Sequence, residues 1–212
     1  MKINRQSFAA IFLATAFASL ALTGCGSARP ARFYTLQDLP AAPQANASPL
    51  PYTVLVGRIV APSLYRDDRI VYGTGPVELG AYDDHRWAEP PAEMLENMLT
   101  DSLRSSGAFR SVQRVGSGGR GQYIVRGHLI ALDEVDTPGV AARFAVEVEL
   151  YDVKAGAVIW HQSYSHDQPV ESKTIPAVVE ALQANVRAGM QQLTGAIIST
   201  LQSQPQAQAQ GQ

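Results

Sequence analysis

The stretch RFAVEVELY, residues 143–151, alternates apolar and charged side chains and decides the fold class. Successive side chains of an extended strand point to opposite faces, so this alternation is typical of a strand with one buried face. The expected buried side chains are Phe144, Val146, Val148 and Leu150. The turn-like residues 152–156 and a second apolar run, residues 158–164, follow directly, so we expect an antiparallel hairpin.

Further strands are indicated on the N-terminal side of this hairpin by short apolar or alternating runs. They are expected at residues 53–60, 69–72, 77–82, 109–114 and 122–132. Apolar residues at helical spacing predict two helices, one from Pro90–Pro91 to Ser106 and a longer one over residues 175–201. Strands with one helix between them and one after them predict an α+β fold. We expect a single domain in which two helices pack on a mixed, mainly antiparallel sheet.

The N-terminus has the pattern of a secretion signal that ends in a lipid attachment site. Lys2 and Arg5 precede an apolar run, Phe8–Leu22, which is too short to span a bilayer but matches a signal-peptide core. The next residues, Leu22-Thr23-Gly24-Cys25, resemble the lipobox of bacterial lipoproteins, which implies acylation of Cys25 and cleavage before it. Cys25 is the single cysteine, which excludes an intramolecular disulfide framework and a multi-cysteine zinc site.

These signals divide the chain into four parts. We expect a signal peptide at residues 1–24, a tether and Pro/Ala-rich loop at 25–51 with a short strand allowed at 33–36, a folded domain at 52–201, and a disordered Gln-rich tail at 202–212. The formal net charge is −2, so the chain has no basic excess and nucleic acid is not an expected partner.

We find no pattern that assembles a catalytic or cofactor site. Gly116–Gly121 matches G-x-G-x-x-G, but a predicted strand follows it where a phosphate-binding site needs a helix N-terminus. Asp83, Asp84 and His85 suggest a metal site, yet neighbouring residues of an extended segment point in opposite directions, which favours a solvated polar loop. The sequence therefore predicts a protein that is not an enzyme, with no catalytic residues, no cofactor and no bound metal.

One group of aromatic and charged residues is a candidate contact surface for a partner protein. Tyr72, Tyr82 and Trp87 stand close to charged residues, among them His85 and Arg86. Tyrosine, tryptophan and arginine are enriched at protein–protein interfaces. Packing in the core is the other interpretation for the aromatic side chains, and the sequence leaves both open.

Several short motifs coincide with those of a known family. They are Phe33–Leu36 shortly after the lipobox, Pro62–Tyr65, Asp68–Tyr72, His85–Pro90, and Tyr151–Asp152 followed by Val158–Trp160. On these motifs, the chain from Cys25 to Leu201 resembles the ABC-type transport auxiliary lipoproteins. That family includes the PqiC-type outer-membrane lipoproteins of MCE intermembrane lipid transport systems. The stretch RWAEP, residues 86–90, is the most specific of the motifs.

The resemblance implies a non-enzymatic accessory, anchored through Cys25 to the periplasmic face of the outer membrane. It would dock a periplasmic MCE-domain protein of an inner-membrane ABC transport system. Gly26, rather than aspartate, follows Cys25, which favours the outer membrane under the usual sorting rule. Self-assembly into a homo-oligomer is within the range of the family. Two other interpretations stay open: a periplasmic module that carries lipid itself, and a regulatory lipoprotein of a cell-wall or secretion machine. A third, an envelope hydrolase, is disfavoured because the sequence assembles no catalytic triad.

Overall fold

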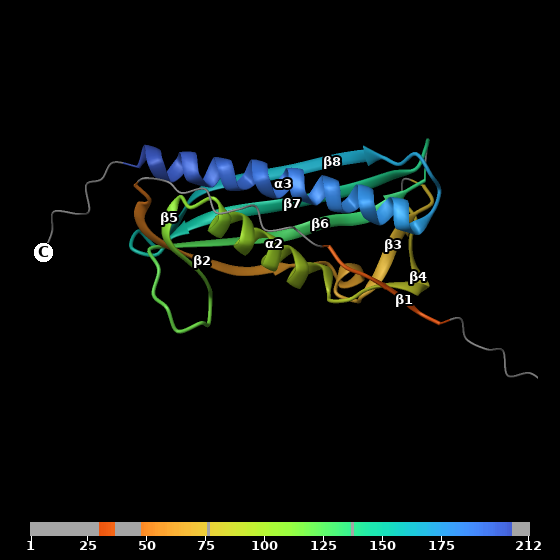
Figure 1. Cartoon of the computed structure of the whole chain (residues 1–212), viewed down its shortest axis with the longest axis horizontal. Coiled ribbons are helices and arrows are strands. Elements are labelled where there is room, and N and C mark those ends of the chain that lie inside the picture. Colours follow the sequence, from red (N-terminus) through yellow and green to blue (C-terminus); the bar gives the residue numbers. More distant parts are fainter. Residues whose placement is uncertain (1–29, 37–47, 76, 137, 205–212) are drawn as a thin grey trace, which may run out of the picture. The chain divides into compact units, whose positions relative to one another are not determined.

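The computed structural model describes residues 30–36, 48–75, 77–136 and 138–204, and Figure 1 shows how their helices and strands are arranged. The strands are β1 (Arg32–Tyr34), β2 (Leu50–Val60), β3 (Arg69–Gly73), β4 (Leu79–Trp87), β5 (Phe109–Arg114), β6 (Tyr123–Val135), β7 (Ala141–Asp152) and β8 (Ala157–Pro169). The helices are α2 (Pro91–Ser105), α3 (Ile175–Ser203) and the short 3-10 helix η1 (Ser63–Tyr65).

All eight strands belong to one sheet, and β6 organises it. One edge of β6 pairs with β7 along its whole length, and β7 pairs with β8, both in antiparallel register. The other edge of β6 is shared, because β2 pairs in parallel with its first half and β3 with its last residues. β5 extends the sheet beyond β2, and β4 followed by β1 extends it beyond β3. We call β6–β7–β8 the wall and β1–β3–β4 the arm.

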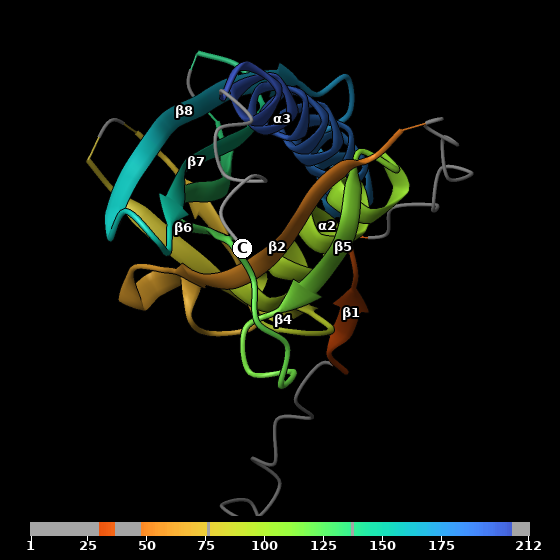
Figure 2. The ribbon, with the colours of Figure 1, turned by 90° about the vertical axis from the view of Figure 1, so that its left-hand side faces the viewer.

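The helices cover one face of the sheet, which curves around them in Figure 2. In α2, Leu95, Leu99 and Leu103 recur at helical spacing and are fully buried against β2 and β5. In α3, the apolar stripe from Val178 to Leu201 lies along β7 and β8. Each fully buried aliphatic side chain contributes about 1.5–3 kcal/mol to folding, so these two stripes hold the layers together.

The predicted α+β fold is confirmed: one domain has two helices on a mixed sheet whose two longest ladders are antiparallel. The side chains expected on the buried face of residues 143–151, namely Phe144, Val146, Val148 and Leu150, are all 0% exposed. The sheet also includes Arg32–Tyr34, which pairs with β4 well ahead of residue 52.

The polar loop expected around Asp83–His85 is wrong, since these residues lie inside β4. Residues of low strand propensity adopt an extended conformation here because β1 pairs alongside, with Arg32 opposite His85 and Tyr34 opposite Trp87. The β3–β4 ladder is irregular between Arg69 and Val71, where β4 contains extra residues. Bulges of this kind change the direction of side chains, and this one lies beside the candidate contact residues.

Several predicted features lie outside the described residues. These are the signal peptide at 1–24, the acylation site Cys25 and most of the Gln-rich tail, residues 205–212. Within the described ranges, no helix combines the length and apolar character needed to cross a membrane.

Candidate functional site

Four aromatic rings of the arm form a continuous group, which we call the aromatic cluster: Tyr34, Tyr72, Tyr82 and His85. Tyr34 and His85 stack with ring centroids 5.6 Å apart, and the Tyr34 hydroxyl lies 2.9 Å from His85 Nδ1. The Tyr82 ring meets His85 edge-on at 5.7 Å and Tyr72 at 4.6 Å. All four side chains are half-buried, so the cluster has one packed side and one side open to solvent.

A buried carboxylate fixes the centre of the cluster. The Tyr82 hydroxyl donates a 2.8 Å hydrogen bond to Glu134 Oε2, and Glu134 is only 8% exposed. Partial burial and the neighbouring Glu134 carboxylate raise the pKa of Tyr82 above its ordinary value, so the phenol keeps its proton. The arrangement orients Tyr82 as a hydrogen-bond donor to Glu134.

A glycine permits the position of Tyr72. Gly80 lies opposite Tyr72 in the β3–β4 ladder. A Cβ atom at Gly80 would come within 2.5 Å of Tyr72 Cζ, so any larger residue would displace the ring. The absence of a side chain at Gly80 therefore lets the Tyr72 ring lie flat across β4 and reach Tyr82.

The last residues of β4 differ in exposure. Arg86 is half-buried, and its Nη1 donates a 2.7 Å hydrogen bond to Asp68 Oδ1. Trp87 is only 1% exposed, so its indole belongs to the hydrophobic core and can affect the surface only by supporting its neighbours. The structure therefore brings together Tyr72, Tyr82 and His85, leaves Arg86 at their border and places Trp87 beneath.

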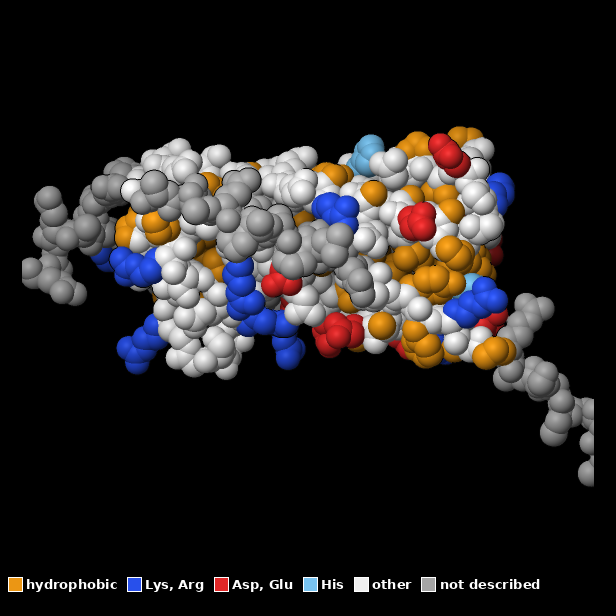
Figure 3. All heavy atoms as spheres, viewed as in Figure 1, with side chains coloured by type: hydrophobic (Ala, Val, Ile, Leu, Met, Phe, Trp, Pro, Cys, Tyr) orange, Lys and Arg blue, Asp and Glu red, His pale blue; other side chains and the backbone are white. Residues whose placement is uncertain are grey.

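Exposed apolar side chains also occur on the arm. Phe33 in β1 is 63% exposed and Leu79 in β4 is 49% exposed. Hydrophobic atoms are visible on the surface at the end of the molecule where β1, β3 and β4 lie in Figure 3. Aromatic and apolar groups that are exposed beside arginine are typical of protein contact surfaces.

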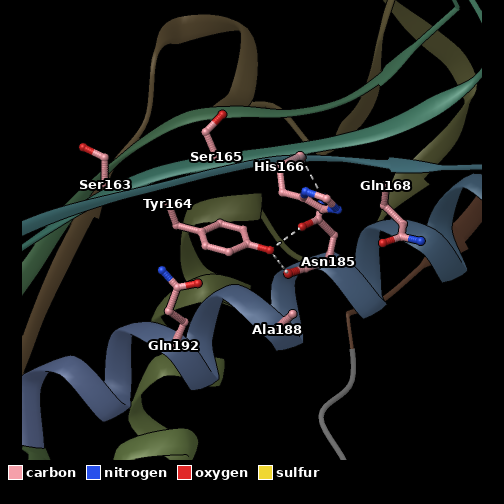
Figure 4. A pocket seen from close by; sticks show the side chains of 8 residues that line it. All are labelled: Ser163, Tyr164, Ser165, His166, Gln168, Asn185, Ala188 and Gln192. Carbon is pink, nitrogen blue, oxygen red and sulfur yellow. Dashed lines mark hydrogen bonds between the residues drawn. The ribbon is translucent and has the colours of Figure 1, made fainter.

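The pocket between β8 and α3 has a different character (Figure 4). It has a volume of about 410 Å³, and its lining is mainly polar. Tyr164 points from β8 towards α3 and donates to Asn185 Oδ1 at 2.8 Å, while Asn185 Nδ2 donates to the carbonyl oxygens of Ala142 and His166. Because these polar groups satisfy one another, the pocket is better explained as a structural link between helix and sheet than as a ligand site.

The junction of wall and arm contains a buried carboxylate that lacks full pairing. Asp133 in β6 is 2% exposed, and Tyr65 of η1 donates to its Oδ2 at 3.4 Å. Its Oδ1 is buried and has no hydrogen-bond partner among the described residues. Burial raises the pKa of Asp133 to about 6, against the opposing effect of Arg143, which lies directly opposite on β7. Arg143 is instead held by two hydrogen bonds to Asp167.

Two histidines approach a carboxylate in the described part of the chain. The histidines His85 and His161 each have a carboxylate oxygen at 3.9 Å, but neither pair includes a nucleophilic side chain. Among the described residues there is no group of three or more histidine, cysteine or acidic side chains placed to hold a metal ion. Gly116–Gly121 leads into β6, as expected, and not into a helix.

Sequence comparison identifies the family of this lipoprotein-like chain. Residues 34–196 match the family model described as ABC-type transport auxiliary lipoprotein component. The chain belongs to this family. Membership makes it an auxiliary component of ABC-type transport, which implies a transporter as partner. The search of curated proteins found no match to its sequence.

Two crystal structures share the fold. A Xanthomonas campestris protein of the DUF330 family is 22% identical and superposes with a TM-score of 0.73, covering 81% of this chain and 97% of its own. A second, uncharacterized protein is 16% identical with a TM-score of 0.64, covering 79% of this chain and 99% of its own. At these identities the likeness shows the fold alone.

Two members of the site were not among the predicted contact residues, Tyr34 and Glu134. Tyr34 belongs to the Phe33–Leu36 motif of the family resemblance, so a signal for it existed. Glu134 lies beyond the predicted end of its strand at residue 132, and nothing in its neighbourhood indicates a tyrosine partner some 50 residues away. Only the β3–β6 pairing brings Glu134 opposite Tyr72.

Proposed function

We propose that this protein is an outer-membrane lipoprotein that docks the periplasmic conduit of an ABC/MCE-type intermembrane lipid transport system and performs no catalysis itself. The observation that carries the proposal is the family match over residues 34–196, an auxiliary lipoprotein component of ABC-type transport. The lipobox-like Leu22–Cys25 and the aromatic cluster supply the two physical functions that docking requires, an anchor and a contact surface.

The anchor is the acylated Cys25. Each buried methylene of an acyl chain contributes about 0.8 kcal/mol, so two or three chains hold a folded domain stably on a bilayer. From Cys25 to Arg32, where β1 begins, a fully extended chain spans at most about 25 Å. The arm therefore stays close to the membrane, and its effective concentration for a conduit that reaches the same membrane is high.

The contact surface is formed by Tyr72, Tyr82, His85 and Arg86. Tyrosine buries a large area at little cost in side-chain entropy, and tyrosine and arginine are enriched among the residues that dominate the energetics of interfaces. Here the tyrosines are already fixed by ring contacts and by Glu134, so little ordering is needed on binding. Trp87 supports this surface from the core.

Replacement of the anchor tests the location and the need for attachment. Cys25→Ser should release the protein from the outer-membrane fraction and fail to complement a detergent-sensitive deletion strain. Ser27→Ala, which changes the tether but leaves the lipobox intact, should fractionate and complement like wild type. Full complementation by the released Cys25→Ser protein would contradict the anchored mechanism.

Capture of the partner tests the contact surface. The double variant Tyr72→Ser, His85→Ala should reduce co-purification of the periplasmic MCE-domain protein at least tenfold, because both rings belong to the cluster. His161→Ala is the matched control, since His161 is exposed on β8, outside the arm. Equal capture by both variants and wild type would exclude the aromatic cluster as the docking surface.

A further inference from the structure

A cleft of about 740 Å³ lies between β2, the start of α2 and the end of β5, and its lining includes no residue of the aromatic cluster. Residues 56–61, which are the end of β2 and the residue after it, line one side of the cleft. Pro90, Ala92 and Glu93 border it on the α2 side, where the carboxylate of Glu93 lies in the first turn of the helix and offsets the partial positive charge of its N-terminus. The volume lies in the range of pockets that hold small organic ligands, about 300–1,000 Å³.

The cleft exists because β5 ends early. β5 pairs with β2 only as far as Val56 opposite Arg114, after which Val115 donates to the Val56 carbonyl and the chain turns away. The next residues of β2 therefore have no neighbouring strand on that side. Two side chains cap this open edge: Glu96 accepts from the Ile59 amide at 2.9 Å, and Arg66 Nε donates to the Ala61 carbonyl at 3.0 Å.

Three guanidinium groups line the cleft. Arg114 is committed to Glu96 and Asn97, with hydrogen bonds of 2.6 Å to each. Arg66 is oriented by the Ala61 carbonyl and has no carboxylate partner within the described residues, and Arg58 has neither an ion pair nor a hydrogen bond there. The lining thus contains three guanidinium groups and two carboxylates, those of Glu93 and Glu96, and neither Arg58 nor Arg66 forms an ion pair among the described residues.

Arg58 lies at an irregularity in the strand. Val56 pairs with Val125 and Ile59 with Gly127, so β2 has one residue more than β6 between these two pairs. A bulge of this kind changes the direction of the side chains beside it. Lys and Arg side chains gather on the surface near β2, β5 and α2 in Figure 3.

Apolar side chains border the same cleft. Val60 and Val115 line it, and their side chains are 52% and 54% exposed. The guanidinium groups therefore suit a negatively charged part of a ligand, and the exposed valines beside them suit a hydrocarbon part. Arginine pairs with phosphate through parallel, charge-assisted hydrogen bonds, which makes phosphate a well-matched anion.

We propose that this cleft binds the phosphate group of an amphiphile, with Arg58 and Arg66 on the phosphate and Val60 and Val115 beside the hydrocarbon part. The proposal goes beyond the docking function and does not depend on it, because the cleft lies on β2 and α2 and not on the arm. A phospholipid and a free phosphate ester share the charged part of this ligand, so the test must separate them.

The test is calorimetric titration of the chain from Cys25 onward carrying Cys25→Ser, which keeps every described residue. The probes are dihexanoyl phosphatidylglycerol below its micellar concentration, glycerol 3-phosphate and inorganic phosphate. We expect the short-chain lipid to bind most tightly. Arg58→Glu should raise its Kd at least tenfold, since a lost charged hydrogen bond corresponds to about 1.5–3 kcal/mol.

Arg110→Glu is the matched control, because Arg110 is exposed on β5 and is not among the residues that line the cleft. Arg58→Glu breaks no hydrogen bond among the described residues, so it should fold normally, and Arg66→Gln gives a second, independent loss. Equal weakening by Arg58→Glu and Arg110→Glu, or the absence of any binding, would overturn the proposal. Equal affinity for glycerol 3-phosphate would overturn the lipid as the source of the phosphate. None of these results affects the anchor and capture tests of the docking function.

Discussion

The wall and the arm of the same sheet are stabilised in different ways. In the wall, β6, β7 and β8 pair over long antiparallel ladders, and α3 buries their apolar face, as with Phe144 and Leu150. In the arm, β1 and β3 have three and five residues, and much of the contact is between half-buried rings and carboxylates.

The difference shows where the chain uses its polar groups. Where α3 packs on the wall, the buried Asn185 of α3 is hydrogen-bonded to β7 and β8, so its polarity serves the connection between the helix and the strands. In and beside the arm, Glu134 is buried beneath a surface of rings, and Asp133 keeps an unpaired oxygen. Buried groups that reduce stability locally are expected where a surface is kept for another purpose. The predictions below test whether this contrast is real.

The largest effect is expected where α3 is linked to the wall. Asn185→Ala removes the donor to two carbonyl oxygens, those of Ala142 and His166, and the acceptor of the Tyr164 hydroxyl. Loss of these bonds at a site that is 1% exposed should lower the free energy of unfolding by about 3 kcal/mol. Urea denaturation measures it, with Gln191→Ala on the exposed side of α3 as control. A loss of less than about 1 kcal/mol would mean that the wall does not depend on this link.

The next largest effect is a gain in stability, which we expect when Asp133 is replaced. Its folded-state pKa is raised to about 6 from an ordinary value of 3.8, so the folded protein favours the protonated acid. This destabilises the wild type above pH 6, and the cost disappears as the pH falls towards 4. A shift of about two pKa units corresponds to about 3 kcal/mol in the free energy of unfolding. Asparagine removes this cost but must still bury its own amide group. Asp133→Asn should therefore raise the free energy of unfolding by about 2 kcal/mol at pH 7.

The pH dependence distinguishes this mechanism from simple repacking. Unfolding of Asp133→Asn and wild type should differ at pH 7 and converge near pH 4.5, because the wild-type carboxyl is then mostly protonated in the folded state. The groups that face Asp133 are the neutral phenol of Tyr65, the guanidinium of Arg143 and, through Arg143, the carboxylate of Asp167. Asp167→Asn serves as the control and should not reproduce the gain at pH 7. A constant difference at both pH values would refute the titration of Asp133 as the cause.

The sequence predicts the wall much better than the arm, for a physical reason. Burial of one face of a strand or helix imposes a local sequence pattern. Two such patterns, the alternation in residues 143–151 and the apolar stripe of α3, are found where expected. The end of β4 has no such pattern, because Asp83–His85 become a strand only through pairing with the distant Arg32–Tyr34. In the same way, the predicted contact residues Tyr72, Tyr82 and His85 do meet, but Glu134 beneath them depends on pairing between strands.

A smaller effect is expected from the centre of the aromatic cluster. Tyr82→Phe removes the donor that lies 2.8 Å from Glu134, a carboxylate that is 8% exposed, while it keeps the ring in place. We expect a loss of about 1.5 kcal/mol in urea denaturation at pH 7. Tyr72→Phe is the matched control, because no hydrogen bond of the Tyr72 hydroxyl occurs among the described residues. Equal losses in the two variants would show that Glu134 does not hold Tyr82.

The smallest change in stability, and the sharpest test of the surface, is Gly80→Ala. The new methyl group would lie 2.5 Å from Tyr72 Cζ and 2.6 Å from its Oη, which are the far end of a side chain that can swing outward. The free energy of unfolding should therefore change by less than about 0.5 kcal/mol, while Tyr72 leaves its 4.6 Å contact with Tyr82. Loss of nuclear Overhauser contacts between the two rings measures the displacement. Gly75→Ala, in the same hairpin with nothing within 4 Å of the added methyl, should keep them. If Gly80→Ala keeps the ring contact, or unfolds the protein like a core variant, the arm is packed as tightly as the wall and the contrast between them fails.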